Sequence, residues 1–451
     1  MTAIPIDDIR TPPEGGAGHR PLPGRLLVIA VSALVLGAAI TRWATAEPNR
    51  PAPTVSAATP SSPADAVVRY ERLVRAEPDN PVAWQSLAIS AVQAVAAGEP
   101  LALYNRAETA LARAESLAPG EFRNDIAGGY LSLARHDFAG ARTRGLAAHA
   151  ADPYNAEALA ILVDAEIELG LYDDAERSLQ SLFDLRPGLA ANSRLSYFRE
   201  LHGDVEGARE AFALAEIAGA GSAQDVANVA LLRSKVAATH LEVEEARDAL
   251  DRAQQYVPGI DTTVGAARIA LTAGEFDEAE RLLEHAMAVA PSADAAEMLR
   301  DLRDYEGTTT ELEELDAFLD ANADEEIAAG ADVRMERAFI LAERGDAAAL
   351  PLAREAFDNR PNNIFTAGTL AWALHKAGDD ATALAYAERS VRLGTQDALL
   401  RFHAAIIFAA NDAPAAAADE LRAALGVSPA FALTARAEAC ALDLGVQCER
   451  G

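Results

Sequence analysis

The side chains that could do chemistry are scattered along this chain and form no familiar catalytic motif. The eight histidines lie apart, and none pairs with another at the spacing of two metal ligands. The sequence lacks a G-x-x-x-x-G-K-[ST] phosphate loop, a G-x-S-x-G nucleophile turn and an H-E-x-x-H zinc motif. We therefore predict a protein that is not an enzyme and has no cofactor and no metal site.

Two cysteines, Cys440 and Cys448, are too few for a zinc site. Outside the cytoplasm they could form a short disulfide that ties the C-terminal tail to the preceding helix, whereas in a reducing compartment they would be free thiols. Eight residues of continuous helix would hold them about 12 Å apart, so a disulfide requires the helix to end near Gly445.

Acidic side chains are concentrated between residues 301 and 326, within an irregular stretch at 292–330. Carboxylates at this density could bind cations or a basic peptide, but the stretch contains no D-x-[DN]-x-[DN]-G calcium loop. The alternative is a helical pair with a solvated acidic face. The whole chain has a formal net charge of −30, which argues against a nucleic-acid partner. This acidity either keeps the protein soluble or attracts a basic partner.

The elements that must position these groups are amphipathic helices in pairs. In residues 156–169 the apolar side chains recur at i, i+3 and i+4, which predicts a helix with one apolar face. Gly170 then ends this helix, Asp173 and Asp174 begin a second, and Pro187 ends that one. Such a pair cannot bury its apolar faces alone, so it needs similar pairs on both sides.

Prolines after predicted helices show that this pair is repeated. Pro119, Pro153 and Pro187 are 34 residues apart (153 − 119 and 187 − 153), and Pro258, Pro291, Pro361 and Pro429 continue at one or nearly two such intervals. A sustained helix–turn–helix period of this length is typical of tetratricopeptide arrays.

The chain resembles the tetratricopeptide repeat family over roughly residues 64–444. Small residues recur where the two helices of a unit cross, namely Ala141, Ala175, Ala208, Ala246, Ala279 and Ala383. Glycines recur before the second helix, namely Gly170, Gly203, Gly274, Gly345 and Gly378. The resemblance implies an all-α fold, an α-solenoid in the form of a right-handed superhelix of about ten helix pairs. It also implies a non-enzymatic scaffold that binds a protein or peptide segment in its concave groove.

In this family the first helix of each unit lines the groove, and counting from the prolines carries its positions onto this chain. The candidate groove residues are Arg123, Tyr130, Glu157, Asp164, Asn228, Lys235, Arg268 and Trp372. Lys235 and Arg268 come from successive units and could form a small anion-binding foothold.

The N-terminal region is organised differently from the repeats. Residues 1–24 are rich in proline and glycine and are predicted to be disordered. Residues 25–46 contain an apolar run that predicts a single transmembrane anchor or a cleaved signal peptide, with Ala44-Thr45-Ala46 as the cleavage pattern. Either alternative would place the repeats outside the cytoplasm, on the membrane or secreted to the periplasm. Residues 47–63 predict an extended linker.

The remaining boundaries follow the repeats. A first array is expected at 64–291, the irregular acidic pair at 292–330, and further repeats with a terminal capping helix at 331–451. A second class of function stays open, in which a cell-envelope assembly factor or an accessory of a metal or solute system uses its acidic surface to bind cations or basic substrates. The sequence does not determine the oligomeric state.

Overall fold

The computed structural model describes residues 62–240, 242–306, 308 and 311–425, and every regular element in these residues is a helix. The helices are α2 (Pro63–Ala76), α3 (Pro81–Ala96), α4 (Ala102–Leu117), α5 (Phe122–Ala134), α6 (Phe138–Ala151), α7 (Ala156–Glu168), α8 (Tyr172–Leu185), α9 (Leu189–Leu201), α10 (Val205–Gly219), α11 (Ala223–Thr239), α12 (Val243–Tyr256), α13 (Ile260–Ala273), α14 (Phe276–Val289), α15 (Ala293–Tyr305), α16 (Leu312–Ala328), α17 (Arg334–Glu343), α18 (Ala349–Asn359), α19 (Ile364–Lys376), α20 (Asp380–Ser390), α21 (Ala398–Ala410) and α22 (Pro414–Leu425).

The pair α7–α8 shows why these sequences fold as units. Asn155 caps α7 by accepting a hydrogen bond from the Ala158 N–H at 3.0 Å. Gly170 follows α7 with φ +71°, and the Leu171 N–H donates to the Glu166 carbonyl at 2.8 Å, which closes the end of the helix. The chain then reverses into α8. The turn glycines predicted from the sequence all adopt positive φ in this way.

The small residues predicted at the helix crossings are all completely buried: Ala141, Ala175, Ala208, Ala246, Ala279 and Ala383 are each 0% exposed. A larger side chain there would push the two helices of a unit apart. The helices from α3 to α22 form ten such pairs (α3–α4 through α21–α22), and α2 precedes them. The prediction of an α-solenoid of about ten helix pairs is confirmed for the described residues.

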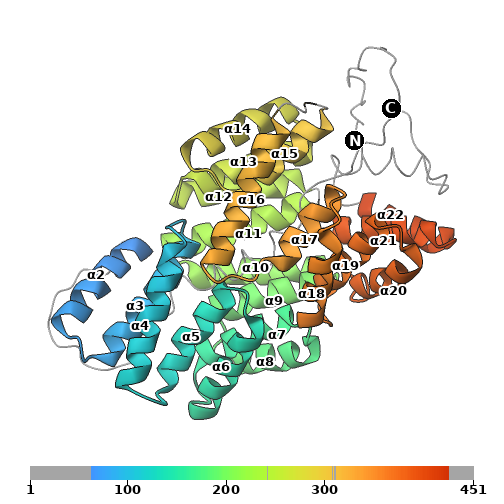
Figure 1. Cartoon of the computed structure of the whole chain (residues 1–451). Helices are drawn as coiled ribbons and strands as arrows, with labels where there is room; N and C mark the ends of the chain where they lie inside the picture. The colour runs from blue at the N-terminus through green and yellow to red at the C-terminus, as the bar shows by residue number, and fades with distance from the viewer. Residues whose placement is uncertain (1–61, 241, 307, 309–310, 426–451) are drawn as a thin grey trace.

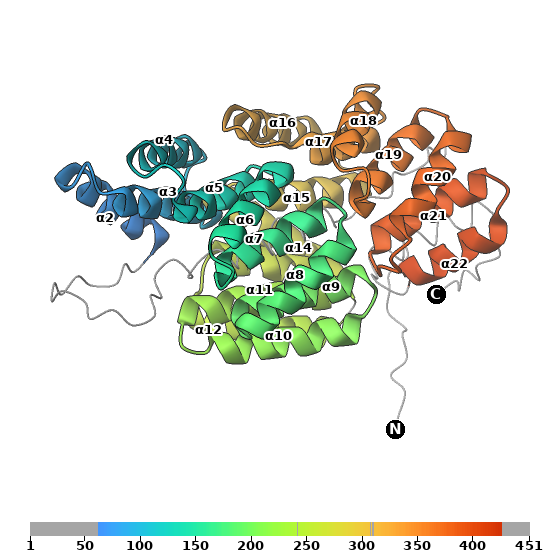
Figure 2. The same ribbon diagram turned by 90° about the horizontal axis from the view of Figure 1, so that it is seen from below.

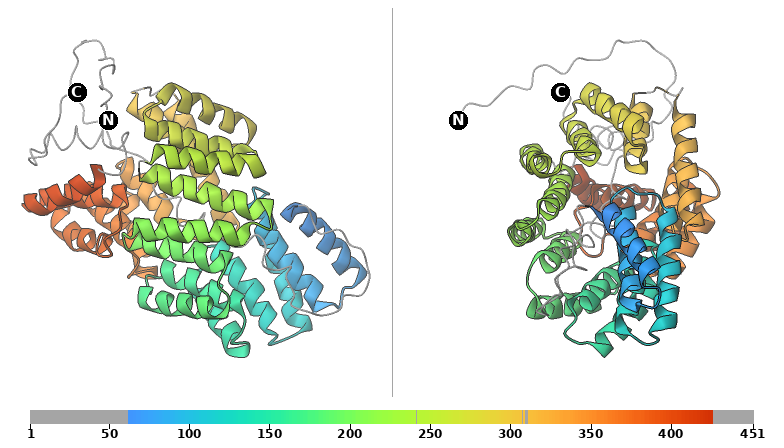
Figure 3. Two further views of the ribbon diagram at one scale, coloured as in Figure 1. Left: turned by 180° about the vertical axis from the view of Figure 1, so that it is seen from behind. Right: turned by 90° about the vertical axis from the view of Figure 1, so that its left-hand side faces the viewer.

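The stacked pairs follow a curved path, which the right-hand panel of Figure 3 shows from the side. We call α2–α15 the first array and α17–α22 the second array; α16 joins them (Figure 1). The second array has its own apolar core, formed by buried residues between Ala338 and Ala424. In Figure 2, α2–α4 and α19–α22 lie at opposite ends of the molecule.

The two arrays contact each other along a line that we call the seam. Three turns of the first array, at Arg135–His136, Gly170 and Gly203, meet three connections of the second array, at Gly330–Asp332, Asn362–Ile364 and Gly394–Gln396. The Asp332 N–H donates to the Arg135 carbonyl at 2.9 Å, and the Ile364 N–H donates to the Tyr172 hydroxyl at 3.2 Å. The solenoid therefore folds back on itself, turn against turn.

Two glycines make this close approach possible. A Cβ atom added at Gly170 would lie 2.2 Å from the Asn362 carbonyl carbon, and one added at Gly203 would lie 2.2 Å from the Gly394 carbonyl oxygen. The equivalent glycines Gly274 and Gly345 have nothing within 4 Å of an added Cβ. The first two glycines thus serve both the turn and the seam, whereas the other two serve the turn alone.

Among the described residues no helix is long and apolar enough to cross a membrane. This finding contradicts the predicted localisation, a single-pass anchor with the repeats outside the cytoplasm. The stretch behind that prediction, residues 25–46, lies outside the described residues, as do residues 1–24 and most of the linker at 47–63. The predicted capping helix at 431–444 and the predicted disulfide Cys440–Cys448 also lie outside them.

Candidate functional site

Charged side chains from four successive first helices gather on one face of the first array. Lys235 of α11 lies in the electrostatic field of Glu200 from α9, Arg268 from α13, and Asp294 and Glu297 from α15. The carboxylate of Asp301, one helical turn after Glu297, lies close enough to Glu297 to raise its pKa. We call this group the inner cluster; its members are Glu200, Lys235, Arg268, Asp294, Glu297 and Asp301.

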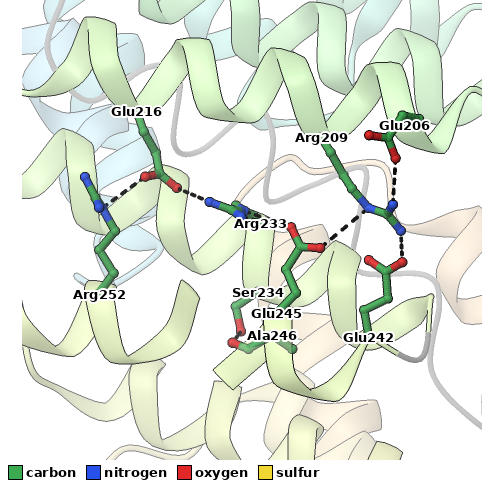
Figure 4. A network of polar contacts seen from close by, with 9 residues as sticks. All are labelled: Glu206, Arg209, Glu216, Arg233, Ser234, Glu242, Glu245, Ala246 and Arg252. Atoms are coloured by element: carbon green, nitrogen blue, oxygen red, sulfur yellow. Dashed lines mark hydrogen bonds and ion pairs between the residues drawn. The ribbon is translucent and has the colours of Figure 1, made fainter. Parts of the chain in front are cut away.

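The helix that carries Lys235 is fixed by an ionic network on its other side (Figure 4). Arg233 of α11 donates to Glu245 of α12 at 3.0 Å and to Glu216 of α10 at 3.4 Å. The next residue, Ser234, donates to the Ala246 carbonyl at 2.8 Å. Because two residues of helix rotate by about 200°, Lys235 points away from Arg233 and toward the inner cluster.

The same network ties together the second helices of two units. Arg209 of α10 bonds to Glu206 at 2.9 Å, pairs with Glu242, and lies 3.6 Å from Glu245 of α12. Arg252 of α12 reaches back to Glu216 of α10 at 3.0 Å (Figure 4). These contacts fix the spacing of the units and therefore the spacing of the inner-cluster side chains.

Arg268 and Asp294 form the best-defined contact within the inner cluster. The guanidinium Nη2 of Arg268 lies 2.8 and 2.7 Å from the two carboxylate oxygens of Asp294. Burial tends to raise the pKa of Asp294, but Arg268 and Lys235 more than offset it, so this pKa lies below its usual value. Asp294 is therefore ionised at neutral pH and already paired with Arg268.

The side chains of Lys235 and Glu297 each have a pKa near neutral pH. Burial, with help from nearby Arg268, lowers the pKa of Lys235 to about 7. Burial and the neighbouring carboxylates of Asp301 and Asp294 raise the pKa of Glu297 to about 8. A charged group placed beside them would change their protonation, so the face can adapt its charge to what it binds.

Among the sequence-predicted residues, Lys235 and Arg268 belong to the inner cluster, whereas Asp164 and Tyr130 are held inside the array. Asp164 accepts a hydrogen bond from Arg194 at 2.6 Å, and both side chains are almost fully buried. Burial raises the pKa of Tyr130 well above its usual value. The Asp164–Arg194 ion pair joins α7 to α9, which is a structural role.

The other predicted residues lie apart from the inner cluster. Arg123 is exposed and pairs with Glu121 at 3.2 Å. Glu157 is half-buried, and burial raises its pKa despite nearby Arg186 and Arg123. Asn228 accepts a hydrogen bond from Gln224 at 2.9 Å within α11.

Trp372 is placed in the second array. Its ring stacks on His403 of α21 with centroids 3.8 Å apart and an interplanar angle of 8°. His403 lies 3.3 Å from Glu343 of α17, and burial is the main cause of its lowered pKa. Trp372 therefore packs between first helices of the second array and is not joined to the inner cluster.

Arginines pair with several carboxylates of the acidic stretch around 301–326. Asp316 pairs with Arg300 and, at 2.8 Å, with Arg344, while Asp324 pairs with Arg337 at 2.8 Å. In the described part of the chain no group of three or more His, Cys, Asp or Glu residues could hold a metal ion.

Sequence reasoning missed most carboxylates of the inner cluster. Asp294 and Asp301 stand at the second and ninth positions of the unit after Pro291, the positions that gave Asn228 and Lys235 two units earlier in the same array. Counting one more unit would have found them, although that unit lacks the terminal proline. Glu297 stands at the fifth position of the same unit, which also lines the groove in this repeat family.

Comparison with known proteins does not place this chain in a family. No family model matches it, and no curated protein matches it. Among solved structures, one described as "Structure of Naa15/Naa10 bound to HypK-THB" is similar to 84% of this chain with 14% identity and a TM-score of 0.27; this chain spans 62% of it, less than two thirds. The crystal structure of the yeast Tom70 is similar to 85% of this chain, covering 92% of that protein, with 14% identity and a TM-score of 0.31. At these scores the assignment of the fold depends on the helix pairs themselves.

Proposed function

We propose that this protein is a non-enzymatic interaction scaffold that binds a basic, extended segment of a partner protein against the inner cluster. The observation that carries the proposal is the charge balance of this face. Four carboxyl groups, those of Glu200, Asp294, Glu297 and Asp301, lie around the basic side chains of Lys235 and Arg268. Asp294 pairs with Arg268 at 2.7 Å, Asp301 lies 3.8 Å from Arg300, and Glu200 lies 3.7 Å from His240. Glu297, which lies beside the carboxylates of Asp294 and Asp301, is therefore the place on this face where added positive charge is most favoured.

Two features support a partner that carries positive charge. The raised pKa of Glu297 reflects burial beside other carboxylates, so a cation bound there would relieve repulsion and lower that pKa. The inner cluster also spans several units, which suits an extended segment making several contacts on a preformed surface. Electrostatic complementarity of this kind favours fast and selective association.

Binding of a basic segment should release protons, which provides a direct test. Isothermal titration of the protein with an arginine-rich peptide at pH 7, in two buffers with different ionisation enthalpies, measures the protons released. We expect a net release, because a cation beside Glu297 favours its ionised form. A glutamate-rich peptide of the same length should not bind.

The matched variants are Glu297→Gln, which removes the titrating carboxyl, and Glu244→Gln, which changes a carboxyl that is 90% exposed on the outer surface. Glu297→Gln should reduce the proton release to the part that comes from Lys235, whose pKa is about 7, whereas Glu244→Gln should leave the release unchanged. Equal binding of the basic and acidic peptides, or proton release that is unchanged in Glu297→Gln, would contradict the proposal.

A further inference from the structure

We propose that the seam is a clasp, at which the two arrays separate reversibly while each array stays folded. This proposal does not depend on what the inner cluster binds. It concerns a contact between segments that are far apart in the chain. The number of residues between the contacting partners is nearly the same at each turn. Hydrogen-bonding partners across the seam are separated by 192 residues in Glu168–Arg360 to 197 residues (332 − 135) in Arg135–Asp332.

Separation without unfolding is favoured by the distribution of apolar residues. The second array keeps its own core, which contains only residues of that array. The apolar cluster at the seam draws its buried members mainly from the first array. Within the described residues, the second array contributes the buried side chains of Ile364 and Leu400, and Phe365 and Leu393 pack against the cluster while partly exposed. The seam thus has a much smaller apolar contact than either array has internally.

Polar contacts make up the rest of the seam, and they centre on Glu168. Its carboxylate lies 3.4 Å from the Arg360 guanidinium and accepts a hydrogen bond from the Tyr197 hydroxyl at 3.2 Å. The backbone carbonyl of Glu168 accepts a hydrogen bond from the side-chain amide of Asn363 at 3.1 Å. The side chain is only 3% exposed in the closed form. Separation of the arrays would return this buried carboxylate to water.

The burial of Glu168 gives the clasp a pH dependence. Burial raises the pKa of Glu168, against the opposing effects of Arg360, His136 and Tyr197 and with a small contribution from Glu336. The closed form therefore binds the Glu168 proton more tightly than the open form does. Closure is favoured below the ordinary pKa of a glutamate and is weakened as pH rises through the pKa of the closed form.

Hydrogen exchange of two backbone amides reports the clasp directly. The amides of Asp332 and Ile364 donate across the seam, whereas the Glu275 amide donates to Ala270 in an equivalent turn away from it. We expect the two seam amides to exchange together, and faster than amides in the middle of α7 and α19. After correction for intrinsic exchange, their protection should fall as pH rises in the wild type and depend less on pH in Glu168→Gln. Asp397 of the second array, which lies in the field of Glu200 and His240 of the first array and whose pKa is raised to about 7, contributes to the pH dependence in the same sense, so the double variant Glu168→Gln/Asp397→Asn should lose most of it.

Gly170→Ala should raise the opening constant by at least tenfold over Gly274→Ala, because only the first substitution adds an atom against the second array. His136→Asn removes the imidazole near Glu168 and suits the positive φ of +58° at that position. The pH dependence should persist in this variant. If the seam amides exchange only with global unfolding, at the same free energy as the middle of α7 and α19, the arrays do not separate and the proposal is overturned.

Discussion

The four turn glycines of this solenoid allow the strength of the seam to be measured by substitution. Gly170, Gly203, Gly274 and Gly345 have nearly the same φ, at +71°, +74°, +74° and +72°. Alanine at any of them should therefore carry the same backbone cost, about 1–2 kcal/mol for a left-handed residue. Any difference between the substitutions reports the surroundings of the added methyl group.

At Gly170 and Gly203 that methyl group would lie 2.2 Å from backbone atoms of the second array. A backbone neighbour cannot rotate away, so the two arrays must shift, and overpacking of this kind costs about 1–3 kcal/mol beyond the common term. This additional loss of stability cannot exceed the free energy with which the seam contacts hold the two arrays together, because a larger clash would open the seam instead. Burial of Ile364 and Leu400 sets that ceiling at about 3–6 kcal/mol, with the cross-seam hydrogen bonds adding about 1 kcal/mol each.

The assay is urea denaturation of all four single variants and of the Gly170→Ala/Gly203→Ala double variant. We expect Gly170→Ala and Gly203→Ala to lose about 1–3 kcal/mol more than Gly274→Ala and Gly345→Ala. The excess losses should be less than additive in the double variant, because one open seam relieves both clashes. Equal losses at all four positions, within about 0.5 kcal/mol, would show that the seam does not form in solution and would refute the reasoning.

Three further predictions concern buried charges. Arg194→Met leaves the Asp164 carboxylate buried without its partner and should cost about 3–5 kcal/mol in urea denaturation, most of which Arg194→Met/Asp164→Leu should recover. As pH falls from 10 to 7, the Lys235→Met variant should become more stable than the wild type, by up to about 1.4 kcal/mol per pH unit. The reason is that Lys235 stays neutral in the folded protein down to about pH 7, whereas it is protonated in the unfolded chain. A difference in stability that does not depend on pH would contradict this. Glu297→Gln should become progressively more stable than the wild type as pH rises from 5 to 8, because the folded Glu297 retains its proton to about pH 8; thermal melts across this range measure the trend, and parallel curves would argue against the buried carboxyl.

The helix pairs could be predicted because each unit repeats its own local signals. Gly170 ends one helix, Asp173 and Asp174 begin the next, and Ala175 fits the crossing, all within one short window of sequence. Lys235 and Arg268 followed from the same regular spacing. These features depend on neighbours along the chain, which a period reveals.

The seam could not be predicted in this way. Gly170 and Gly274 look alike in sequence, yet only Gly170 faces another backbone. That difference depends on how the curvature of many units brings the second array against the first. Asp164 was expected in a groove, but its neighbour Arg194, one unit later, closes over it as an ion pair.

The seam also changes how this solenoid responds to force. An open solenoid behaves as a uniform spring, since each unit contacts only the next. Here the units from α5 to α10 are braced by the second array at three turns, so the middle of the molecule is stiff while the seam is closed. The pair α3–α4, together with α2, projects beyond the braced turns and forms a lever that bends on α5 (Figure 1). Among the described residues, compliance is therefore expected in the units outside the braced turns, which are α2–α4 and α11–α15.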